Sequence, residues 1–257
     1  KIIKVISGDC NKTKLILKKI YGKVNSGKIF IAKNIKTAEA AKVIENTQRD
    51  INVAFINEIT KLFKKININI FDVLKTAETK WNFLNFQPGF VGGHCIGVDP
   101  YYLSYLAKKK KTGSNLILSG RKVNNNFPIF LSQYINSCIT KKNKILILGL
   151  TFKENVSDLR NTKVIDLIKS LKKKGHKVFV HDTCAYENDV KKMNLNITPL
   201  SKKDKYDTII LTVAHDNYKK LNYSFFKKKL NKNGKIFDIK AIWRNKKFPK
   251  TINYIIL

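Results

Sequence analysis

The feature that most limits the fold is a series of apolar segments of strand length in the second half of the chain. They alternate with polar and helical stretches such as Lys163–Lys174. This alternation is typical of a parallel sheet covered on both faces, which binds ligands outside the carboxyl ends of its strands. Residues 141–257 are therefore expected to form such an α/β domain. Its predicted strands are Ile145–Leu150, His176–Asp182, Asp207–Val213 and Lys235–Ile239.

A helical pattern runs from Thr37 to Lys65 without a glycine or proline. A helix of about 29 residues is over ~40 Å long, which favours a spine that joins domains or pairs subunits. Residues 36–140 are thus expected to form a central helical region that dimerises. Its further predicted helices are Ile70–Thr79, Pro100–Lys109 and Phe127–Thr140.

The first 35 residues have the pattern of the tail of an α/β unit. A strand is predicted at Lys1–Ser7, a helix at Lys12–Tyr21 and a short apolar run at Lys28–Ala32. Such a partial sheet is expected to expose apolar surface. The residues concerned are Ile2, Ile3 and Ile6.

The net charge of +33 arises from 51 basic and 18 acidic residues. A basic chain attracts phosphates. However, only four of the basic residues are arginine, the side chain that best recognises phosphates and bases, and the lysines are spread along the chain. Specific nucleic-acid binding is therefore not favoured. No apolar run approaches the ~18 residues of a membrane span, and the first residues do not form a signal peptide, so a cytoplasmic protein is expected.

The four cysteines are widely scattered and show no CxxC spacing. Neither a disulfide framework nor a metal site is expected from them, and reduced thiols are the better interpretation. Cys95 stands out because glycines surround it and a helix is predicted just after it. An accessible thiol near a helix start is a candidate nucleophile, although a free cysteine is more often a small buried hydrophobe.

Two residues near this cysteine in the sequence, Asp99 and His94, each have more than one possible role. Asp99 precedes Pro100 and is expected to be the N-cap of a helix, which does not exclude a catalytic role. His94 is either a group that tunes the thiol or a hydrogen-bonded loop histidine.

The loop that follows the first predicted strand of the C-terminal domain, Gly149–Arg160, is the expected site for a phosphate-bearing ligand. It lacks the GxGxxG pattern of a dinucleotide site. Lys153 and Arg160 are candidates to hold phosphates, and Asp158 either fixes Arg160 or caps the next helix. The alternative is a charged, solvated loop.

Three segments in this order and spacing resemble the UDP-glucose/GDP-mannose dehydrogenase family: Ala38–Asn46, Val91–Pro100 and Thr151–Arg160. The forms of Lys36–Asp50 and Thr79–Phe83 are similar to its bacterial branch that acts on UDP-N-acetylhexosamines, the UDP-N-acetyl-D-galactosamine and UDP-N-acetyl-D-glucosamine 6-dehydrogenases. The resemblance implies an α/β fold with a dinucleotide-binding Rossmann domain, a central dimerisation region and a Rossmann-like UDP-sugar domain.

The resemblance also implies an activity, the NAD-dependent four-electron oxidation of a UDP-sugar at C6 to a uronate, for polysaccharide biosynthesis. Cys95 would form a thiohemiacetal and then a thioester, which water hydrolyses. Lys42 and Asn46, which lie four residues apart on one helix face, would stabilise the oxyanion. Without the resemblance, Lys42 would be interpreted as a solvated helix lysine. Asp99 would activate the water. The binding residues implied are Lys153, Phe83, Phe86, Gly92 and Lys240 for the substrate, and Arg160 with Asp158 for NAD.

The chain departs from the family at its beginning, where the family has a complete NAD-binding domain with a glycine-rich loop. Residues 1–35 match only the last strand and helix of that domain, so we expect a fragment or a split gene whose missing domain another chain supplies. The chain alone is expected to be inactive. The alternatives are a non-catalytic remnant that binds UDP-sugar or only dimerises, and a basic nucleic-acid binder.

Overall fold

The computed structural model describes residues 2–139, 141–201 and 203–257. They form two compact units, Lys1–Arg49 and Asp50–Leu257, which divide within helix α2 (Ile35–Lys65). Two predicted element ends, Lys1 and Thr140, lie outside the described residues. The division of the chain at residues 35 and 140 stays a prediction.

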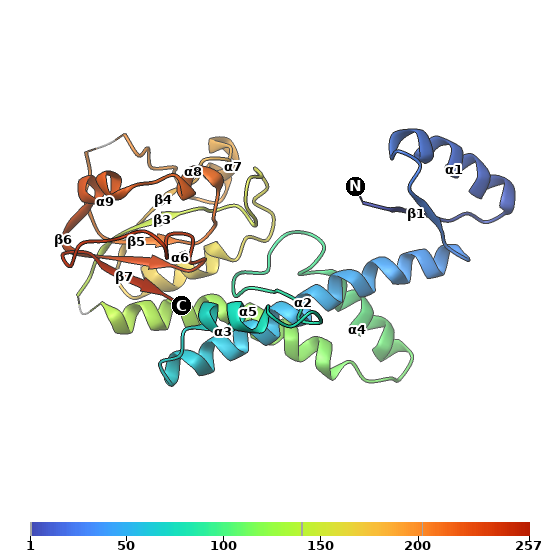
Figure 1. Cartoon of the computed structure of the whole chain (residues 1–257), viewed down its shortest axis with the longest axis horizontal. Coiled ribbons are helices and arrows are strands. Elements are labelled where there is room, and N and C mark those ends of the chain that lie inside the picture. Colours follow the sequence, from blue (N-terminus) through green and yellow to red (C-terminus); the bar gives the residue numbers. More distant parts are fainter. Residues whose placement is uncertain (1, 140, 202) are drawn as a thin grey trace. The chain divides into compact units, whose positions relative to one another are not determined.

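The first unit contains a strand–helix–strand element followed by the start of α2 (Figure 1). Strand β1 (Lys4–Ile6) pairs in parallel with β2 (Ile29–Ile31), and helix α1 (Asn11–Val24) connects them. A parallel pair needs a crossover, which α1 provides. The predicted order of elements in residues 1–35 is therefore confirmed.

Much of the apolar surface of this unit is uncovered. Ile2 and Ile3 are 83% and 58% exposed, as expected, and none of the residues of α1 is buried. The expectation for Ile6 is wrong, because this side chain is buried. Ile6 lies inside the strand pair opposite Ile31, and its carbonyl accepts a hydrogen bond from the amide of Ala32.

The second unit is built on a sheet of five parallel strands in the order β4-β3-β5-β6-β7. The four predicted strands are confirmed, although the fourth begins at Leu230, earlier than expected. The fifth was not predicted, because its four residues follow a turn-rich segment and form only an edge of the sheet. The bounds are β3 (Lys144–Leu148), β4 (Lys177–His181), β5 (Tyr206–Leu211), β6 (Leu230–Asp238) and β7 (Asn253–Ile256).

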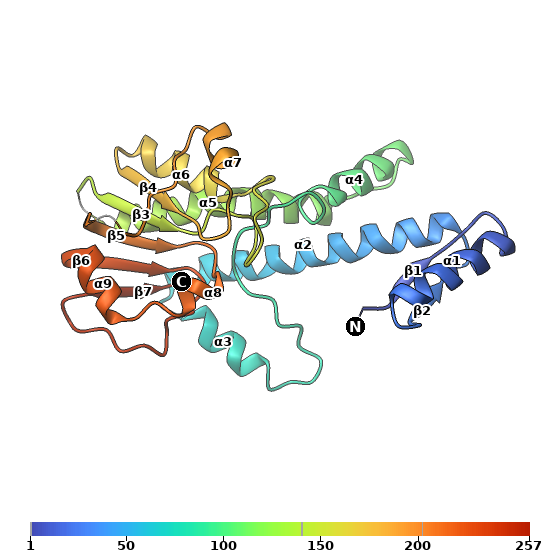
Figure 2. The ribbon, with the colours of Figure 1, turned by 90° about the horizontal axis from the view of Figure 1, so that it is seen from above.

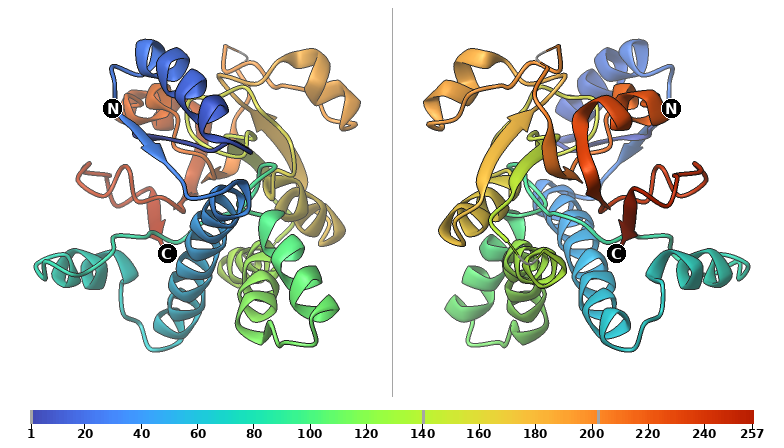
Figure 3. Two further views of the ribbon diagram at one scale, coloured as in Figure 1. Left: turned by 90° about the vertical axis from the view of Figure 1, so that its right-hand side faces the viewer. Right: turned by 90° about the vertical axis from the view of Figure 1, so that its left-hand side faces the viewer.

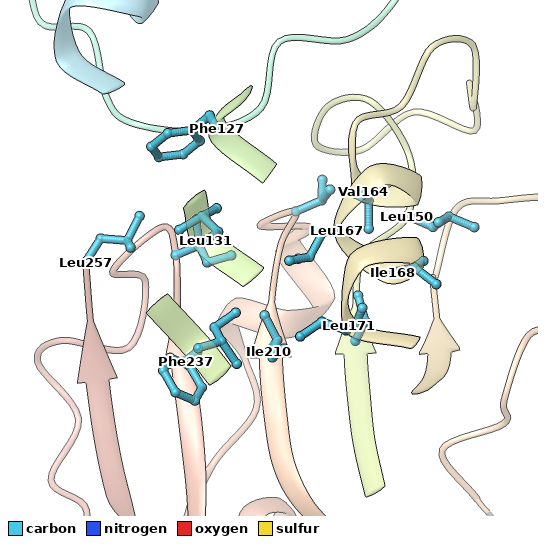
Figure 4. Packing of buried hydrophobic residues seen from close by; sticks show 14 of the residues in the cluster. Phe127, Leu131, Leu150, Val164, Leu167, Ile168, Leu171, Ile210, Phe237 and Leu257 are labelled. Carbon is cyan, nitrogen blue, oxygen red and sulfur yellow. The ribbon is translucent and has the colours of Figure 1, made fainter. Parts of the chain in front are cut away.

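Helices cover both faces of this sheet, so alternate side chains of each strand enter different cores. One core joins Ile145 and Ile147 of β3 to helices α5 (Asn115–Cys138) and α6 (Val164–Lys173). Figure 4 shows this packing at close range, and Figure 2 and Figure 3 show the layers from further directions. The other core joins the alternate residues of the strands to three short segments. These are α8 (Asp216–Lys219), α9 (Tyr223–Lys229) and the turn around Trp243, whereas α7 (Glu187–Lys192) belongs to the first core.

The uninterrupted pattern of α2 forms one helix of 31 residues, as expected. The shorter helices α3 (Ile70–Ala77) and α4 (Asp99–Lys109) also lie close to their predicted positions. The side chain of Asn69 caps α3 by accepting hydrogen bonds from two backbone amides. Among the described residues, no helix has both the length and the apolar character to cross a membrane.

Helix α5 begins twelve residues before the predicted start at Phe127, and Pro128 lies inside it. The prediction was wrong because the polar residues before Phe127 resemble a loop. In the structure Arg121 and Asn124 are buried, and they bond to Asp50 of α2. Gly120 allows the two helices to approach closely, since a Cβ there would lie 3.5 Å from Ile51.

We expect Leu131→Ala in α5 to lower the free energy of unfolding by about 3 kcal/mol, because Leu131 is fully buried between α5 and the sheet and its truncation leaves a cavity. Leu116→Ala is the matched control in the same helix. Leu116 is 69% exposed, so its truncation should cost less than ~0.5 kcal/mol. Urea denaturation followed by circular dichroism measures both values. Equal values for the two variants would contradict the assignment of the core.

Candidate active site

The loop that carries Cys95 is bound to the loop that follows β3. The amide of Gly93 donates to the carbonyl of Arg160 at 3.0 Å, and the side chain of Asn161 donates to the carbonyl of Gly93 at 3.1 Å. Two segments separated by about seventy residues therefore form one edge of the site. The polar loop after the first strand and the cysteine loop, which the sequence analysis considered separately, are brought together.

Two glycines make this close approach sterically feasible. A Cβ on Gly92 would lie 2.7 Å from the carbonyl oxygen of Asn161, and a Cβ on Gly93 would lie 3.0 Å from the ring of Phe152. Gly93 also has a φ of +82°, which side chains rarely adopt. The glycine pair is thus required by packing, and the role of Gly92 in substrate binding stays a prediction.

Cys95 is half-buried, and its sulfur lies 2.9 Å from Nδ1 of His94. Its carbonyl accepts hydrogen bonds from the amides of Val98 and Asp99. Helix α4 begins at Asp99, and Val98 is its N-cap, so the N-cap assignment of Asp99 is wrong by one residue. The reason is that the amide of Asp99 already makes a helical hydrogen bond, to the residue four positions earlier.

Asp158 and Arg160 form an ion pair next to the thiol. Nε and Nη2 of Arg160 donate to the carboxylate of Asp158 at 2.5 to 3.0 Å, and the backbone amide of Arg160 adds a further bond. These hydrogen bonds lower the pKa of Asp158 to about 2 and raise the pKa of Arg160. Of the two predicted roles for Asp158, fixing Arg160 is confirmed. Their contact with NAD stays a prediction.

A buried network holds the loop after β3 in place. The carboxylate of Asp182, directly after β4, accepts hydrogen bonds from the amides of Leu150, Thr151 and Cys184. Nε2 of His215 lies 3.1 Å from the same carboxylate. Burial alone would raise the pKa of Asp182, but these bonds outweigh it and hold the pKa well below its ordinary range. Asp182 and His215 are residues that sequence reasoning missed, although Asp182 ends one predicted strand and His215 lies just after another.

Asp182, Cys184 and His215 form a group with the donor types of a metal site. One donor atom of each residue lies within 4.8 Å of the others, and both nitrogens of the His215 ring already have hydrogen-bond partners. Cys184 lies 3.4 Å from Nδ1 of His215, whereas Asp182 lies against Nε2 on the opposite side of the ring. The amide of Asn155 also donates to Nδ1 and occupies its lone pair. The group therefore acts as a hydrogen-bonded support for the loop.

The start of the cysteine loop is held from two sides. Asn57 of α2 exchanges two hydrogen bonds with the backbone of Gly89, both at 2.9 Å. Nζ of Lys240 donates to the carbonyl of Pro88 at 3.3 Å. Burial lowers the pKa of Lys240, and the carboxylates of Glu154 and Asp238 oppose this shift. Asn57 is a further residue that sequence reasoning missed.

The remaining predicted substrate residues lie on both loops. Lys153 is exposed, with its ammonium 5.6 Å from the centre of the Phe152 ring. Phe83 and Phe86 are half-buried and pack against the core of the second unit. Their contacts with a substrate stay predictions.

Lys42 and Asn46 belong to the first unit, so their geometry relative to Cys95 also stays a prediction. Both lie on α2, four residues apart, as predicted. Lys42 is exposed and forms an ion pair with Glu45 at 3.0 Å, whereas Asn46 is only 3% exposed.

We expect Asp182→Asn to lower the free energy of unfolding by about 2 kcal/mol at pH 7, because the neutral amide is a weaker acceptor for the buried donors. A carboxyl group with a depressed folded-state pKa stabilises the fold above its unfolded pKa, near 4, and loses this effect as the pH falls toward the folded-state pKa. The difference between the two proteins should therefore shrink from pH 7 to pH 3.5. Urea titrations at both pH values test this, and a constant difference would contradict it.

Two domain models of one known protein family match the chain, one after the other. Residues 36–126 match the central domain of the UDP-glucose/GDP-mannose dehydrogenase family, and residues 146–245 match the UDP binding domain of the same family. Protein CapL of Staphylococcus aureus is 42% identical over 248 residues, which are 94% of this chain and 58% of the relative. The UDP-N-acetyl-D-glucosamine 6-dehydrogenase of Salmonella typhi is 42% identical over 228 residues, which are 86% of this chain and 53% of the relative.

A solved structure extends the similarity to the fold. The UDP-N-acetyl-mannosamine dehydrogenase Cap5O from Staphylococcus aureus superposes with a TM-score of 0.80 at 27% identity, over 99% of this chain and 59% of that chain. The chain thus spans a little more than half the length of these relatives. Because two domain models of one family match in order and together cover most of the chain, it belongs to the UDP-glucose/GDP-mannose dehydrogenase family.

Proposed function

We propose that this chain is the C-terminal part of an NAD-dependent nucleotide-sugar 6-dehydrogenase, which oxidises C6 of a UDP-N-acetylhexosamine to the uronate for polysaccharide biosynthesis. The observation that carries this proposal is the docking of the cysteine loop on the loop after β3, which puts a thiol beside a loop that bears the cationic side chains of Lys153 and Arg160, at the carboxyl edge of the sheet. That edge is where parallel sheets bind ligands. The name of the Salmonella typhi relative supports the substrate class.

The UDP-sugar would bind between the two loops. Lys153 is exposed on the loop after β3 and offers an ammonium group to a phosphate. Phe83 and Phe86 precede the cysteine loop and would line the pocket, and the backbone of Gly92 would allow a sugar to approach closely. Lys240 would contact the substrate from the end of β6, provided that binding competes with its bond to Pro88.

Cys95 would supply the nucleophile. Its thiolate would add to the C6 aldehyde to give a thiohemiacetal, which is oxidised to a thioester and then hydrolysed. Lys42 and Asn46 would stabilise the oxyanion, and Asp99, at the start of the helix after Cys95, would activate the hydrolytic water.

The residues of this chain fit only one part of an NAD site. Arg160 is exposed and is oriented by Asp158, so it can hold a phosphate of the dinucleotide. No GxGxxG loop is present in the sequence to hold the rest. NAD, when bound, would accept the two hydrides of the oxidation. We infer that a complete NAD-binding domain, in the same or another chain, must complete the enzyme.

The same helix that carries Lys42 also supports a homodimer. Phe55 and Leu62, seven residues apart on α2, are 59% and 50% exposed. Two large apolar residues on one face of a long helix favour a subunit interface. The free cysteines fit a reducing compartment such as the cytoplasm.

A second candidate function is a non-catalytic remnant that binds UDP-sugar or only dimerises. The match of residues 146–245 to the UDP binding domain of the family favours it, because that domain binds without catalysing by itself. It differs from the first proposal in one respect: completion with an NAD-binding domain would not produce activity.

We expect Lys153→Ala to weaken the binding of UDP-N-acetylglucosamine about tenfold, because a charge-assisted contact with a phosphate is lost. Isothermal titration calorimetry of the chain measures the affinity. Lys192→Ala, at an exposed lysine on α7, is the control that should leave it unchanged. An unaltered affinity for Lys153→Ala would rule out the proposed phosphate contact.

We expect the chain alone to form no NADH from UDP-N-acetylglucosamine and NAD. Completed with an NAD-binding domain, it should form uronate, and Cys95→Ser should reduce uronate formation at least ~100-fold because a hydroxyl is a poorer nucleophile than a thiolate. NADH absorbance and product mass are the measurements, and Cys138→Ser is the control. Wild-type uronate formation by Cys95→Ser would refute the covalent mechanism, and an inactive completed enzyme would favour the remnant.

A further inference from the structure

The sequence of the cysteine loop drew attention to His94, but the proposed function gives this residue no role. Its Nδ1 lies 2.9 Å from the sulfur of Cys95, and its side chain is otherwise exposed. Among the described residues, the hydrogen-bond partner of the His94 ring is the sulfur of Cys95. A nitrogen at this distance can take the proton of the thiol directly.

The charges around the pair suit such a transfer. Asp158 lies near enough to His94 for the imidazole to help lower the pKa of the Asp158 carboxyl group, and Arg160 lies near enough to Cys95 for the thiol to help raise the pKa of the Arg160 guanidinium. The Asp158 carboxylate would stabilise an imidazolium, and the Arg160 guanidinium would stabilise a thiolate. Both groups come from the loop after β3, whereas Asp99 follows on the adjoining helix. When a proton moves from the sulfur to the nitrogen, the new thiolate therefore lies near the Arg160 guanidinium, and the new imidazolium lies near the Asp158 carboxylate.

Two of the other cysteines, Cys10 and Cys184, lack this arrangement. Cys10 contacts the hydroxyl of Thr13, which is not a base. Cys184 lies 3.4 Å from Nδ1 of His215, but that nitrogen already accepts the amide hydrogen of Asn155. The contrast indicates that the contact at Cys95 is suited to proton transfer.

We propose that His94 is the catalytic base for Cys95. This inference rests on the proposed function, which supplies the aldehyde. The S–H bond breaks as the proton moves to Nδ1, and the sulfur lone pair forms the C–S bond to the aldehyde carbon. The electron pair of the carbonyl π bond moves to the oxygen, which then takes the proton back from the imidazolium. The sum is a neutral thiohemiacetal, and no oxidant is consumed in this step.

The test measures the alkylation of Cys95 by iodoacetamide in the chain itself, site by site with mass spectrometry, from pH 5 to pH 9.5. In His94→Gln we expect the rate at Cys95 to fall about tenfold at pH 7 and to approach the wild-type rate at pH 9.5, where hydroxide ionises the thiol. Cys10 is the internal control, and its rate should not change. Rate profiles for Cys95 that coincide at every pH would overturn the proposal.

Two further measurements separate a base from a merely structural residue. In His94→Ala, added imidazole should restore the alkylation rate of Cys95 at pH 7, and no restoration counts against the base. Calorimetric binding of UDP-N-acetylglucosamine to wild type and His94→Gln separates the two proposals. If the chain binds the nucleotide sugar but the alkylation rate of Cys95 does not depend on His94, only the proposed role of His94 is overturned. If the alkylation rate depends on His94 but the chain does not bind the nucleotide sugar, the proposed function is overturned. The activation of the Cys95 thiol by His94 then still holds.

Discussion

The carboxylate of Asp182 is the interaction on which the geometry of the site depends. It lies at the end of β4 and accepts hydrogen bonds from the residues that leave β3 and from the segment after β4 itself. Through His215 it also holds the segment after β5. Because a buried carboxylate needs several donors to remain charged, it fixes three chain segments together at one edge of the sheet.

The cysteine loop takes its position from this edge. Phe152 and Asn161 form the surface against which Gly92 and Gly93 pack, and no larger residue fits there. At its other end the loop is held by Asn57 of α2 and by Lys240 in the turn after β6, which are far apart in sequence. The backbone of the cysteine loop is thus held by contacts at both of its ends.

Several of these relations could not be read from a single sequence. Arg121 and Asn124 look like residues of a polar loop, yet they are buried in helix α5, where both donate hydrogen bonds to Asp50 on a neighbouring helix. A polar side chain signals exposure unless its partner is known, and these partners are about seventy residues away. The edge strand β7 was missed for a similar reason. Its four residues carry little strand signal of their own, and they form a strand because they pair with β6.

The sequence by itself determined the parallel α/β architecture, the long helix and the identity of the candidate nucleophile. These follow from local periodicity, from glycine and from side-chain chemistry, which are properties of neighbouring residues. Only the tertiary structure decided that the cysteine loop lies on the loop after β3 and that Asp158 binds Arg160 beside the thiol. It also decided that the ring of His94 turns toward sulfur. Such relations depend on distances between segments remote in the chain or on the rotamers that packing selects, which no local pattern encodes.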